Sequence, residues 1–316
     1  MLNVSSRIYY EVWPMLLQVF YFLLSIIGLY YGAEISLDSS EKVGKSWRLS
    51  PLLIGMFIVG FGTSLPEFFV SQLACFRGVP AMAMGNIIGS NIANTFLILG
   101  VSSLIYPIGV EGRDINKQFI FHLVLTIILG CFLFLGQISM ITALIMGLFL
   151  VVYFYSNLRS PSSKIEEIPQ VKITDYLKII FGFSLLYGSG ELLVYSGSRL
   201  GRNFGISEFA ISAIFVAFGT SFPELVTALL ASIKKKHSNI IIGNVIGSNI
   251  FNGAFVLGSI GFYDFKTESS FKSEIFALMI ISISFLLLNS FKIRISKKFS
   301  LFFLSAYALF IYLWLQ

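Results

Sequence analysis

The chain has 316 residues, of which 56% are hydrophobic and only 12% are charged, and its formal net charge is +6. This composition excludes a water-soluble globular protein. Residues 118–158 alone contain no Asp, Glu, Lys or Arg, and one membrane-spanning helix requires only about 20 apolar residues. We therefore expect an all-α integral membrane protein embedded in the lipid bilayer.

Charge-free stretches predict ten membrane-spanning helices. The fourth and fifth form a tight hairpin at Gly136 and Gln137, because the uncharged run of residues 118–158 is long enough for two crossings and too long for one. In chain order, the predicted spans are residues 12–33, 50–73, 81–104, 118–136, 138–156, 174–195, 207–232, 238–261, 273–291 and 299–316.

The distribution of Lys and Arg predicts the orientation. If the N-terminus lies outside, these ten spans put 16 of the 22 basic residues into inside segments. The positive-inside rule then places both termini outside and the central loop in the cytoplasm, in a plasma (inner) membrane. The basic run at residues 234–236 is interpreted as an inside loop that sets topology, and neither a nucleic-acid nor a protein partner is expected.

The second predicted span contains a glutamate within an apolar segment. Residues 61–67 read FGTSLPE, and Glu67 lies near the middle of the otherwise uncharged run 49–76. A carboxylate in a bilayer is expensive, so it indicates a functional site. Pro66 lacks an N–H and clashes with the carbonyl of Gly62, so the helix should kink or break here. The backbone at such a break must line a protein-enclosed or aqueous cavity.

The third span follows with a polar block, residues 85–94, that reads GNIIGSNIAN. Ser90 and Asn94 are four residues apart and share one face of a helix. Gly85 and Gly89 have the Gly-x-x-x-Gly spacing that permits close helix packing. Packing and a place in the ion path both remain open for these glycines.

Both motifs recur in the second half of the chain. Residues 218–224 read FGTSFPE, which places Glu224 157 residues after Glu67, and residues 243–252 read GNVIGSNIFN at an offset of 158. Each half contains five spans, and because five is odd, the second half enters the membrane from the opposite side. The prediction is two inverted-topology five-helix repeats, at residues 1–156 and 174–316, joined by a cytoplasmic loop at residues 157–173.

Spans 2, 3, 7 and 8 meet at mid-membrane in this arrangement, and together they offer only oxygen ligands. Oxygen ligation suits hard cations such as Ca²⁺, which takes about 6–8 oxygens, and Na⁺ by similar chemistry, whereas it argues against zinc and copper. Ca²⁺ and Na⁺ are expected as transported ions, and no cofactor is expected. The candidate side chains are Glu67, Glu224, Thr63, Ser64, Thr220, Ser221, Ser90, Asn94, Ser248 and Asn252.

The formal charge of this site predicts how transport is coupled. Two ionised glutamates carry −2, which one Ca²⁺ or two Na⁺ would neutralise. A neutral site can face either side without moving net charge through low dielectric, whereas two close carboxylates in an empty site repel each other. We therefore expect the carrier to change conformation easily when loaded and poorly when empty.

Several of these polar residues have a structural alternative. The two glutamates could form a structural buried pair, and Glu34 and Glu191, which also correspond at the 157-residue offset, are interpreted as interfacial residues or as part of the ion path. His122 is expected to have no special role. The other asparagines of the polar blocks are interpreted as caps or, alternatively, as ligands: Asn86, Asn91, Asn244 and Asn249.

The two motif pairs resemble the alpha-repeats of the cation/Ca²⁺ exchanger superfamily, and within it the prokaryotic sodium/calcium exchangers. The resemblance covers essentially the whole chain. It implies four central cation positions, with spans 1 and 6 sliding as a pair across the rigid remainder. It also implies as ligands the side chains of Thr63, Ser64, Glu67, Ser90, Asn94, Thr220, Ser221, Glu224, Ser248 and Asn252, with the backbone carbonyls of Gly60 and Ala217.

The position of Asn252 departs from part of this superfamily. Some relatives, the potassium-dependent branch among them, have an aspartate there, whereas both halves of this chain carry asparagine. The resemblance therefore disfavours potassium dependence and leaves the formal site charge at −2. It also favours sodium coupling over proton coupling.

The predicted function is secondary active antiport of Ca²⁺ for Na⁺, by alternating access at a midplane site. The alternative is an antiporter that couples Ca²⁺ or another divalent cation to H⁺. A passive channel is disfavoured because the halves are antiparallel, whereas pore rings usually arise from parallel symmetry. An enzyme is not expected, because no nucleophile, nucleotide loop or metal-ligand histidine accompanies the carboxylates.

Overall fold

The chain is an all-α membrane protein. The computed structural model describes residues 4–78, 80–110, 112–158, 168–203, 219–235, 238–266 and 271–314. Within these ranges, nine helical segments are long and apolar enough to cross a membrane, and Phe222–Ile233 is a shorter apolar helix at the place of the seventh predicted span. Residues 207–218 of that span lie outside the described part of the chain.

The elements follow the predicted order. Up to residue 158 they are α1 (Val4–Ser46), α2 (Pro51–Ile54), the π-helix η1 (Gly55–Gly60), α3 (Phe61–Thr63), α4 (Leu65–Phe76), α5 (Pro80–Ile92), the π-helix η2 (Ala93–Ile98), α6 (Leu99–Ile105), α7 (Arg113–Leu135), β1 (Gln137–Ile138) and α8 (Met140–Leu158). After it come α9 (Ile173–Asn203), α11 (Phe222–Ile233), α12 (Ser238–Ile250), the π-helix η4 (Phe251–Val256), α13 (Leu257–Ile260), the 3₁₀-helix η5 (Gly261–Tyr263), β2 (Phe265–Lys266), α14 (Lys272–Ser290) and α15 (Lys297–Trp314).

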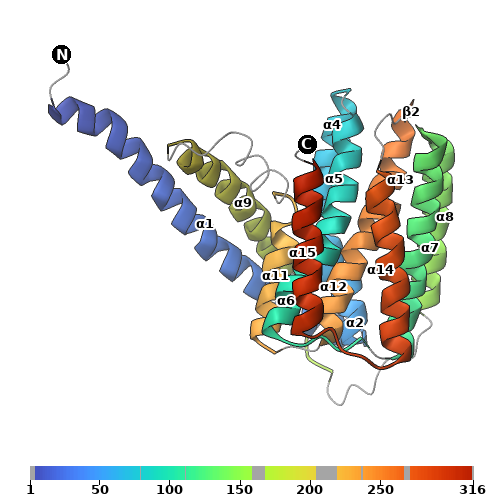
Figure 1. The fold of residues 1–316 in the computed structure, drawn as a ribbon. Helices are drawn as coiled ribbons and strands as arrows, with labels where there is room; N and C mark the ends of the chain where they lie inside the picture. Colours follow the sequence, from blue (N-terminus) through green and yellow to red (C-terminus); the bar gives the residue numbers. More distant parts are fainter. Residues whose placement is uncertain are drawn as a thin grey trace.

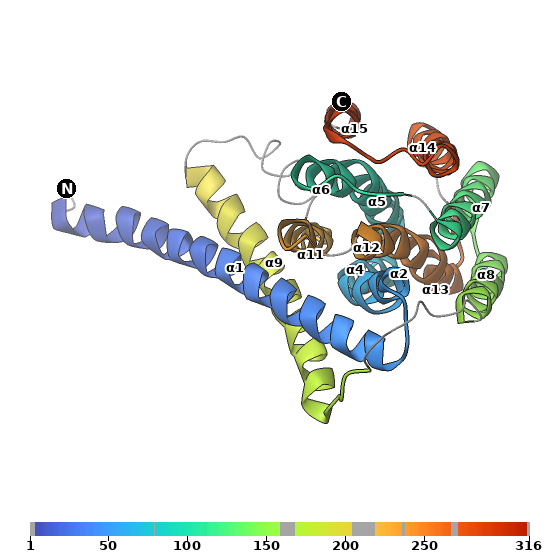
Figure 2. The same ribbon diagram turned by 90° about the horizontal axis from the view of Figure 1, so that it is seen from below.

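Four helices that carry the repeated motifs occupy the middle of the bundle. Viewed along the bundle in Figure 2, α4, α5, α11 and α12 lie at the centre, with α7, α8, α14 and α15 along one rim and α1 and α9 crossing on the other. In Figure 1 the end of α4 and β2 lie at the top, which we call the upper face. The connection from α14 to α15 lies at the bottom, which we call the lower face.

Two small β-pairings on opposite faces show the inversion of the repeat. On the upper face β1 pairs antiparallel with β2, with Ile138 opposite Phe265. An antiparallel bridge joins Ile108 to Ile295, in the connection between α14 and α15 on the lower face. At the 157-residue offset of the repeat, position 108 of the lower pairing corresponds to position 265 of the upper one, and position 138 of the upper pairing corresponds to position 295 of the lower one. The two pairings are therefore equivalent in the repeat but lie on opposite faces. Such an exchange between faces requires an axis in the membrane plane, so the two halves are inverted-topology repeats.

The helices α1 and α9 are longer than predicted. The spans were expected to end at residues 33 and 195, but α1 has 43 residues and ends at Ser46, and α9 ends at Asn203. The end of α1 stays helical although it is charged, because Lys45 and Glu41 form an ion pair of 2.7 Å at i,i+4 spacing. At the end of α1, the fall in hydrophobicity therefore indicates where the apolar span ends, and the helix continues beyond that point.

These two long helices pack against each other through their backbones. A Cβ atom on Gly32 of α1 would stand 2.8 Å from the backbone nitrogen of Leu186, and one on Gly182 of α9 would stand 2.7 Å from that of Ser36. Near the lower face, Lys42 and Asp175 form an ion pair of 2.7 Å. Small residues at such a crossing allow dense van der Waals contact, so α1 and α9 form one closely packed unit.

Glycines also bring α12 against α2 and η1. A Cβ atom on Gly243 would stand 2.3 Å from the carbonyl oxygen of Leu52, and one on Gly55 would stand 2.4 Å from that of Ile240. The packing interpretation of the Gly-x-x-x-Gly spacing is thus confirmed for the second half. In the first half, no described atom lies within 4 Å of a Cβ built on Gly85.

Substitution of Gly243 by Val is expected to destabilise the fold, because its nearest neighbour is the backbone of Leu52, which cannot move aside easily. Overpacking of this kind lowers the free energy of unfolding by roughly 1–3 kcal/mol. Gly147→Val is the matched control, since Gly147 lies on α8 with no described atom within 4 Å of its Cβ. Thermal unfolding in detergent should show a lower melting temperature for Gly243→Val only; equal melting temperatures would contradict this packing.

Candidate cation site

Both glutamate motifs contain a break in the helix. Between α3 and α4, Ser64 has φ −85° and ψ 2°, and Pro66 is the second residue of α4. In the other half, Ser221 has φ −89° and ψ 5° and precedes α11, in which Pro223 is again the second residue. The break that the prolines predict is confirmed, and its geometry is the same in both halves. The first turn of each new helix starts within the bundle.

The carboxyl groups of Glu67 and Glu224 are fully buried, and each lies in the first turn of its helix. The positive end of a helix dipole favours a negative charge at this position. No Lys or Arg among the described residues forms an ion pair with either glutamate. The prediction that both glutamates face the bundle interior and not the lipid is confirmed, and their charge lacks a cationic partner there.

Two serines cross-link the halves through these carboxyl groups. Ser64 of the first motif donates a hydrogen bond of 3.3 Å to Glu224 Oε1. Ser221, its counterpart in the second motif, donates a hydrogen bond of 3.4 Å to Glu67 Oε1. Each glutamate is therefore bonded to the serine of the opposite half, which is the arrangement that two motifs sharing one site require.

The remaining hydroxyl groups repeat this crossing. Ser90 donates to Glu67 Oε1 over 3.3 Å and lies 3.4 Å from the hydroxyl of Thr220. In the equivalent place, the hydroxyl of Thr63 lies 3.4 Å from that of Ser248. The structure thus brings together all the hydroxyl groups that the sequence predicted for the site.

Two asparagines hold the glutamate segments in position. Asn86 donates to the backbone carbonyl of Glu67 over 3.1 Å and accepts a hydrogen bond of 3.1 Å from Thr220. Asn244 donates to the backbone carbonyl of Glu224 over 3.4 Å. The sequence predicted a structural role for these asparagines, and the contacts show what it is: they fix the first turn of α4 and of α11.

In the part of the chain that the structure describes, three π-helices accompany the site, and the sequence did not predict them. The carbonyl of Gly60, the last residue of η1, accepts a hydrogen bond of 3.2 Å from Ser248. Asn94 lies in η2 and Asn252 lies in η4. Single turns of π-helix often occur at functional sites, because they redirect side chains and carbonyl groups. No residue type in these segments distinguishes them from ordinary helix.

Several oxygen atoms of the site lack a hydrogen bond. Asn94 and Asn252 are fully buried, and neither side chain has a hydrogen-bond partner among the described residues. The same holds for the Oε2 atoms of Glu67 and Glu224. An unsatisfied buried polar group costs about 1–3 kcal/mol, and a hard cation would satisfy these oxygens. No hydrogen bond joins either asparagine to the glutamates, and Ala217 lies outside the described residues.

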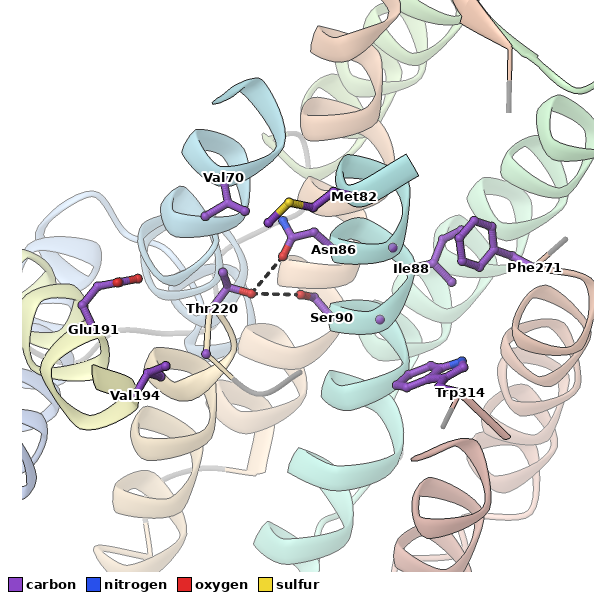
Figure 3. Close-up of a pocket in the computed structure, with 13 residues that line it drawn as sticks. Val70, Met82, Asn86, Ile88, Ser90, Glu191, Val194, Thr220, Phe271 and Trp314 are labelled. Atoms are coloured by element: carbon purple, nitrogen blue, oxygen red, sulfur yellow. Dashed lines mark hydrogen bonds between the residues drawn. The ribbon is translucent and has the colours of Figure 1, made fainter. Parts of the chain in front are cut away.

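A cavity of about 450 Å³ extends from the upper face toward the site. Figure 3 shows Thr220 in the cavity wall, joined by hydrogen bonds to Ser90 and Asn86, with Met82 above Asn86 on α5 and Trp314 across α5 from Thr220. Because Ser90 also donates to Glu67, the cavity ends one side chain away from a buried carboxyl group. The site is therefore approached from the upper face in this conformation.

His122 has more partners than the sequence indicated. It is buried, its Nδ1 lies 2.7 Å from the hydroxyl of Ser282, and its Nε2 lies 3.1 Å from Nδ2 of Asn249. Ser282 gives its own hydrogen to the carbonyl of Leu278, so Nδ1 is the histidine donor and Nε2 accepts from Asn249. The imidazole links α7 and α14 to the residue that follows Ser248, which is a structural contact that the sequence did not indicate.

A buried carboxyl pair from inverted halves, surrounded by other side-chain oxygen atoms and bordered by a cavity, is typical of an integral membrane transporter of cations. The comparison with known proteins gives the family. The family model described as "Sodium/calcium exchanger protein" matches residues 17–159 and 175–316, and the chain belongs to this family.

Individual relatives agree with this assignment. The chain is 35% identical over 253 residues to an uncharacterized membrane protein of Methanocaldococcus jannaschii, covering 78% of this chain and 82% of that protein. It is 34% identical to the putative antiporter CaxA of Alkalimonas amylolytica, with 77% and 80% covered. It is 25% identical to the sodium/calcium exchanger MaX1 of Methanosarcina acetivorans, with 77% and 83% covered.

Solved structures of the sodium-calcium exchanger NCX_Mj have the same fold. One of them, soaked with Na⁺ and Sr²⁺, has a TM-score of 0.80 at 30% sequence identity and covers 93% of this chain and 97% of its own. Another, soaked with zero Na⁺ and Ca²⁺, has a TM-score of 0.81 at 29% identity. The chain is thus a cation/Ca²⁺ antiporter and not an enzyme.

Proposed function

We propose that the protein exchanges Ca²⁺ for Na⁺ at one site shared by Glu67 and Glu224. The observation that carries the proposal is the crossed pair of hydrogen bonds, from Ser64 to Glu224 and from Ser221 to Glu67. These bonds tie each carboxyl group to the opposite half and leave one buried oxygen of each without a partner among the described residues. A cation between them would occupy those oxygens and neutralise the pair.

The proposed ligands are oxygen atoms of residues in and next to the repeated motifs. They comprise the two carboxylates, the motif hydroxyls, the two unpartnered amides and one backbone carbonyl from each half. Ala217 is included only through the resemblance to the family. The proposed set is Glu67, Glu224, Thr63, Ser64, Thr220, Ser221, Ser90, Asn94, Ser248, Asn252, Gly60 and Ala217.

We propose alternating access as the mechanism, with α1 and α9 moving together. Their backbone contact and the Lys42–Asp175 ion pair favour motion as one body. The upper cavity reaches the site, whereas at the other end of the path Lys234 forms an ion pair of 2.5 Å with Glu34 of α1 and lies 3.6 Å from Asp38. A cavity that reaches the site from one side, with an ion-paired lysine on the other, is an arrangement expected of one end state of alternating access.

The orientation and the repeat boundaries are part of the same proposal. Basic residues gather at the lower face, in the turns after α11 and α14, and the positive-inside rule makes that face cytoplasmic. Both termini then lie outside, in the plasma (inner) membrane. The repeats are residues 1–156 and 174–316, joined by a cytoplasmic loop at residues 157–173; the family model matches the chain in two separate segments that fit these limits.

Counter-ion-dependent flux tests the proposed function. Purified protein in liposomes loaded with ⁴⁵Ca²⁺ should release the label when Na⁺ is present outside and retain it in choline medium. A proton gradient imposed without Na⁺ distinguishes the H⁺-coupled alternative from Na⁺ coupling, because only an H⁺-coupled antiporter would release Ca²⁺ under that gradient alone. Ca²⁺ release down its gradient with no counter-cation, at the rate of exchange, would exclude an antiporter.

Asn252→Asp is expected to change the coupling between ions. The side chain is buried and unpartnered, so an aspartate there would raise the formal site charge from −2 to −3 and demand another cation or a proton. The reversal potential of Ca²⁺ flux at fixed gradients reports the charge moved per Ca²⁺. Asn94→Asp places the same charge at the equivalent position of the other half. An unchanged reversal potential in both variants would remove these asparagines from the site.

A further inference from the structure

One carboxylate in the upper cavity is not used by the proposed cation site. Glu191 lies on α9 and contributes to the cavity wall opposite α5, and Figure 3 shows its side chain extending from α9 toward Thr220. Among the described residues that line the cavity, it alone is charged; the other polar groups are neutral, as in Asn86 and Ser90. A cation that enters from the upper face therefore meets one fixed negative charge before the buried site.

Glu191 is also free, in contrast to its counterpart in the other half. No ion pair or hydrogen bond joins its carboxylate to a described residue. Glu34, at the equivalent position of α1, is bonded to Lys234. The pKa of Lys234 is raised: partial burial opposes the charged form, but the hydrogen bond to Glu34 and the charge of Asp38 outweigh it. Among the described residues, the glutamate of α1 is thus paired with a lysine, whereas the glutamate in the upper cavity has no cationic partner.

An unpaired charge in such a cavity acts on ions over a distance. Low-dielectric walls focus its field into the cavity, which raises the local concentration of counter-ions and the rate at which they enter. The effect depends on ionic strength, because the Debye length falls from about 30 Å at 0.01 M salt to about 8 Å at 0.15 M. A divalent cation responds more strongly than a monovalent one, since its energy in the field is twice as large.

We propose that Glu191 is a capture site for divalent cations in the upper cavity, which holds Ca²⁺ transiently and delivers it to the pair of buried glutamates. This inference rests on the proposed function, because it names an additional binding position on the path to that site. Glu191 contributes to the rate of entry and not to the final coordination. Because Glu34 is paired with Lys234 while Glu191 lines the upper cavity, the rise in the rate of cation entry should be specific to the upper face.

Side-specific kinetics of Glu191→Gln test this proposal. In right-side-out and inverted membrane vesicles, ⁴⁵Ca²⁺ uptake driven by Na⁺ is measured against Ca²⁺ concentration at low and at physiological ionic strength. The KM for Ca²⁺ should rise roughly tenfold at low ionic strength on one side of the membrane only, with kcat unchanged, and the difference should shrink with added salt. Glu191→Asp should retain most of the wild-type KM, and Glu191→Lys should raise it further.

Asp264→Asn is the matched control. Asp264 is an exposed carboxylate near the same upper face, next to β2, and it accepts a hydrogen bond of 3.3 Å from Gln137 outside the cavity. Its removal should leave KM unchanged. An unaltered KM in Glu191→Gln, or an equal change on both sides, overturns the capture site while wild-type exchange upholds the proposed function. Absence of Na⁺-driven uptake by the wild type would instead refute the proposed function itself.

Discussion

Replacement of either Glu67 or Glu224 by Gln is expected to abolish Ca²⁺ transport while leaving the protein folded. Gln preserves the size of the side chain and can still accept the hydrogen bond from the serine of the other half. It removes one of two charges, so the remaining −1 no longer neutralises a divalent ion in the bilayer. We expect Na⁺-driven ⁴⁵Ca²⁺ flux to fall at least about 100-fold, which corresponds to roughly 3 kcal/mol of lost stabilisation.

The control for this prediction is another buried glutamate. Glu274 of α14 is 5% exposed, and its carboxylate accepts hydrogen bonds of 2.6 Å from Trp314 and 2.8 Å from Ser273. It is away from the crossed pair, so Glu274→Gln should keep exchange within a few-fold of the wild type. Near-normal exchange by Glu67→Gln or Glu224→Gln, in protein that elutes as a single folded species, would contradict the shared site.

Disulfide cross-links are expected to separate motion within the α1–α9 unit from motion against the core. A Cβ on Gly28 of α1 would lie 3.1 Å from Cβ of Ser189 on α9, and a Cβ on Gly190 of α9 would lie 3.8 Å from Cβ of Phe222 on α11. Both are near the roughly 3.5–4.5 Å that a disulfide spans. Cysteines at positions 28 and 189 should cross-link without loss of exchange, whereas cysteines at 190 and 222 should block it.

The cross-linking is carried out in a background without the native cysteines, Cys75 and Cys131. Exchange by the blocked variant should return on addition of a reductant, which distinguishes a conformational lock from misfolding. An unchanged flux after the cross-link between α9 and α11 would contradict the proposed motion, because α9 would then not move relative to the core. Loss of flux on joining α1 to α9 would contradict their motion as one body.

The sequence predicted the features of the site that depend on local chemistry. Pro66 and Pro223 cannot donate a backbone hydrogen bond, so the helix breaks followed directly from them. The burial of Glu67 and Glu224 followed from their position within long uncharged runs. Their meeting followed from the odd number of spans in each repeat, and the crossed hydrogen bonds from each serine to the glutamate of the other half bear it out.

Features that depend on tertiary packing could not be predicted in this way. The bond between His122 and Ser282 joins residues 160 positions apart, and nothing near either residue indicates the partner. In the short π-helices at Asn94 and Asn252, each backbone hydrogen bond joins residues five apart instead of four apart. Such a short change leaves the hydrophobic periodicity of the whole span almost intact. The ends of α1 depend on side-chain pairs such as Glu41 with Lys45, which a hydropathy boundary does not include.

The proposed mechanism requires two carboxylates from oppositely oriented halves to bind one divalent cation inside the bilayer. Crystals soaked with Sr²⁺ in place of Ca²⁺ test it most directly, because the anomalous signal locates the ion. We expect a single strong peak within about 2.3–2.7 Å of a carboxylate oxygen of both Glu67 and Glu224, and none in crystals of Glu67→Gln. A peak bound by only one of the two glutamates, or one that persists in that variant, would contradict it.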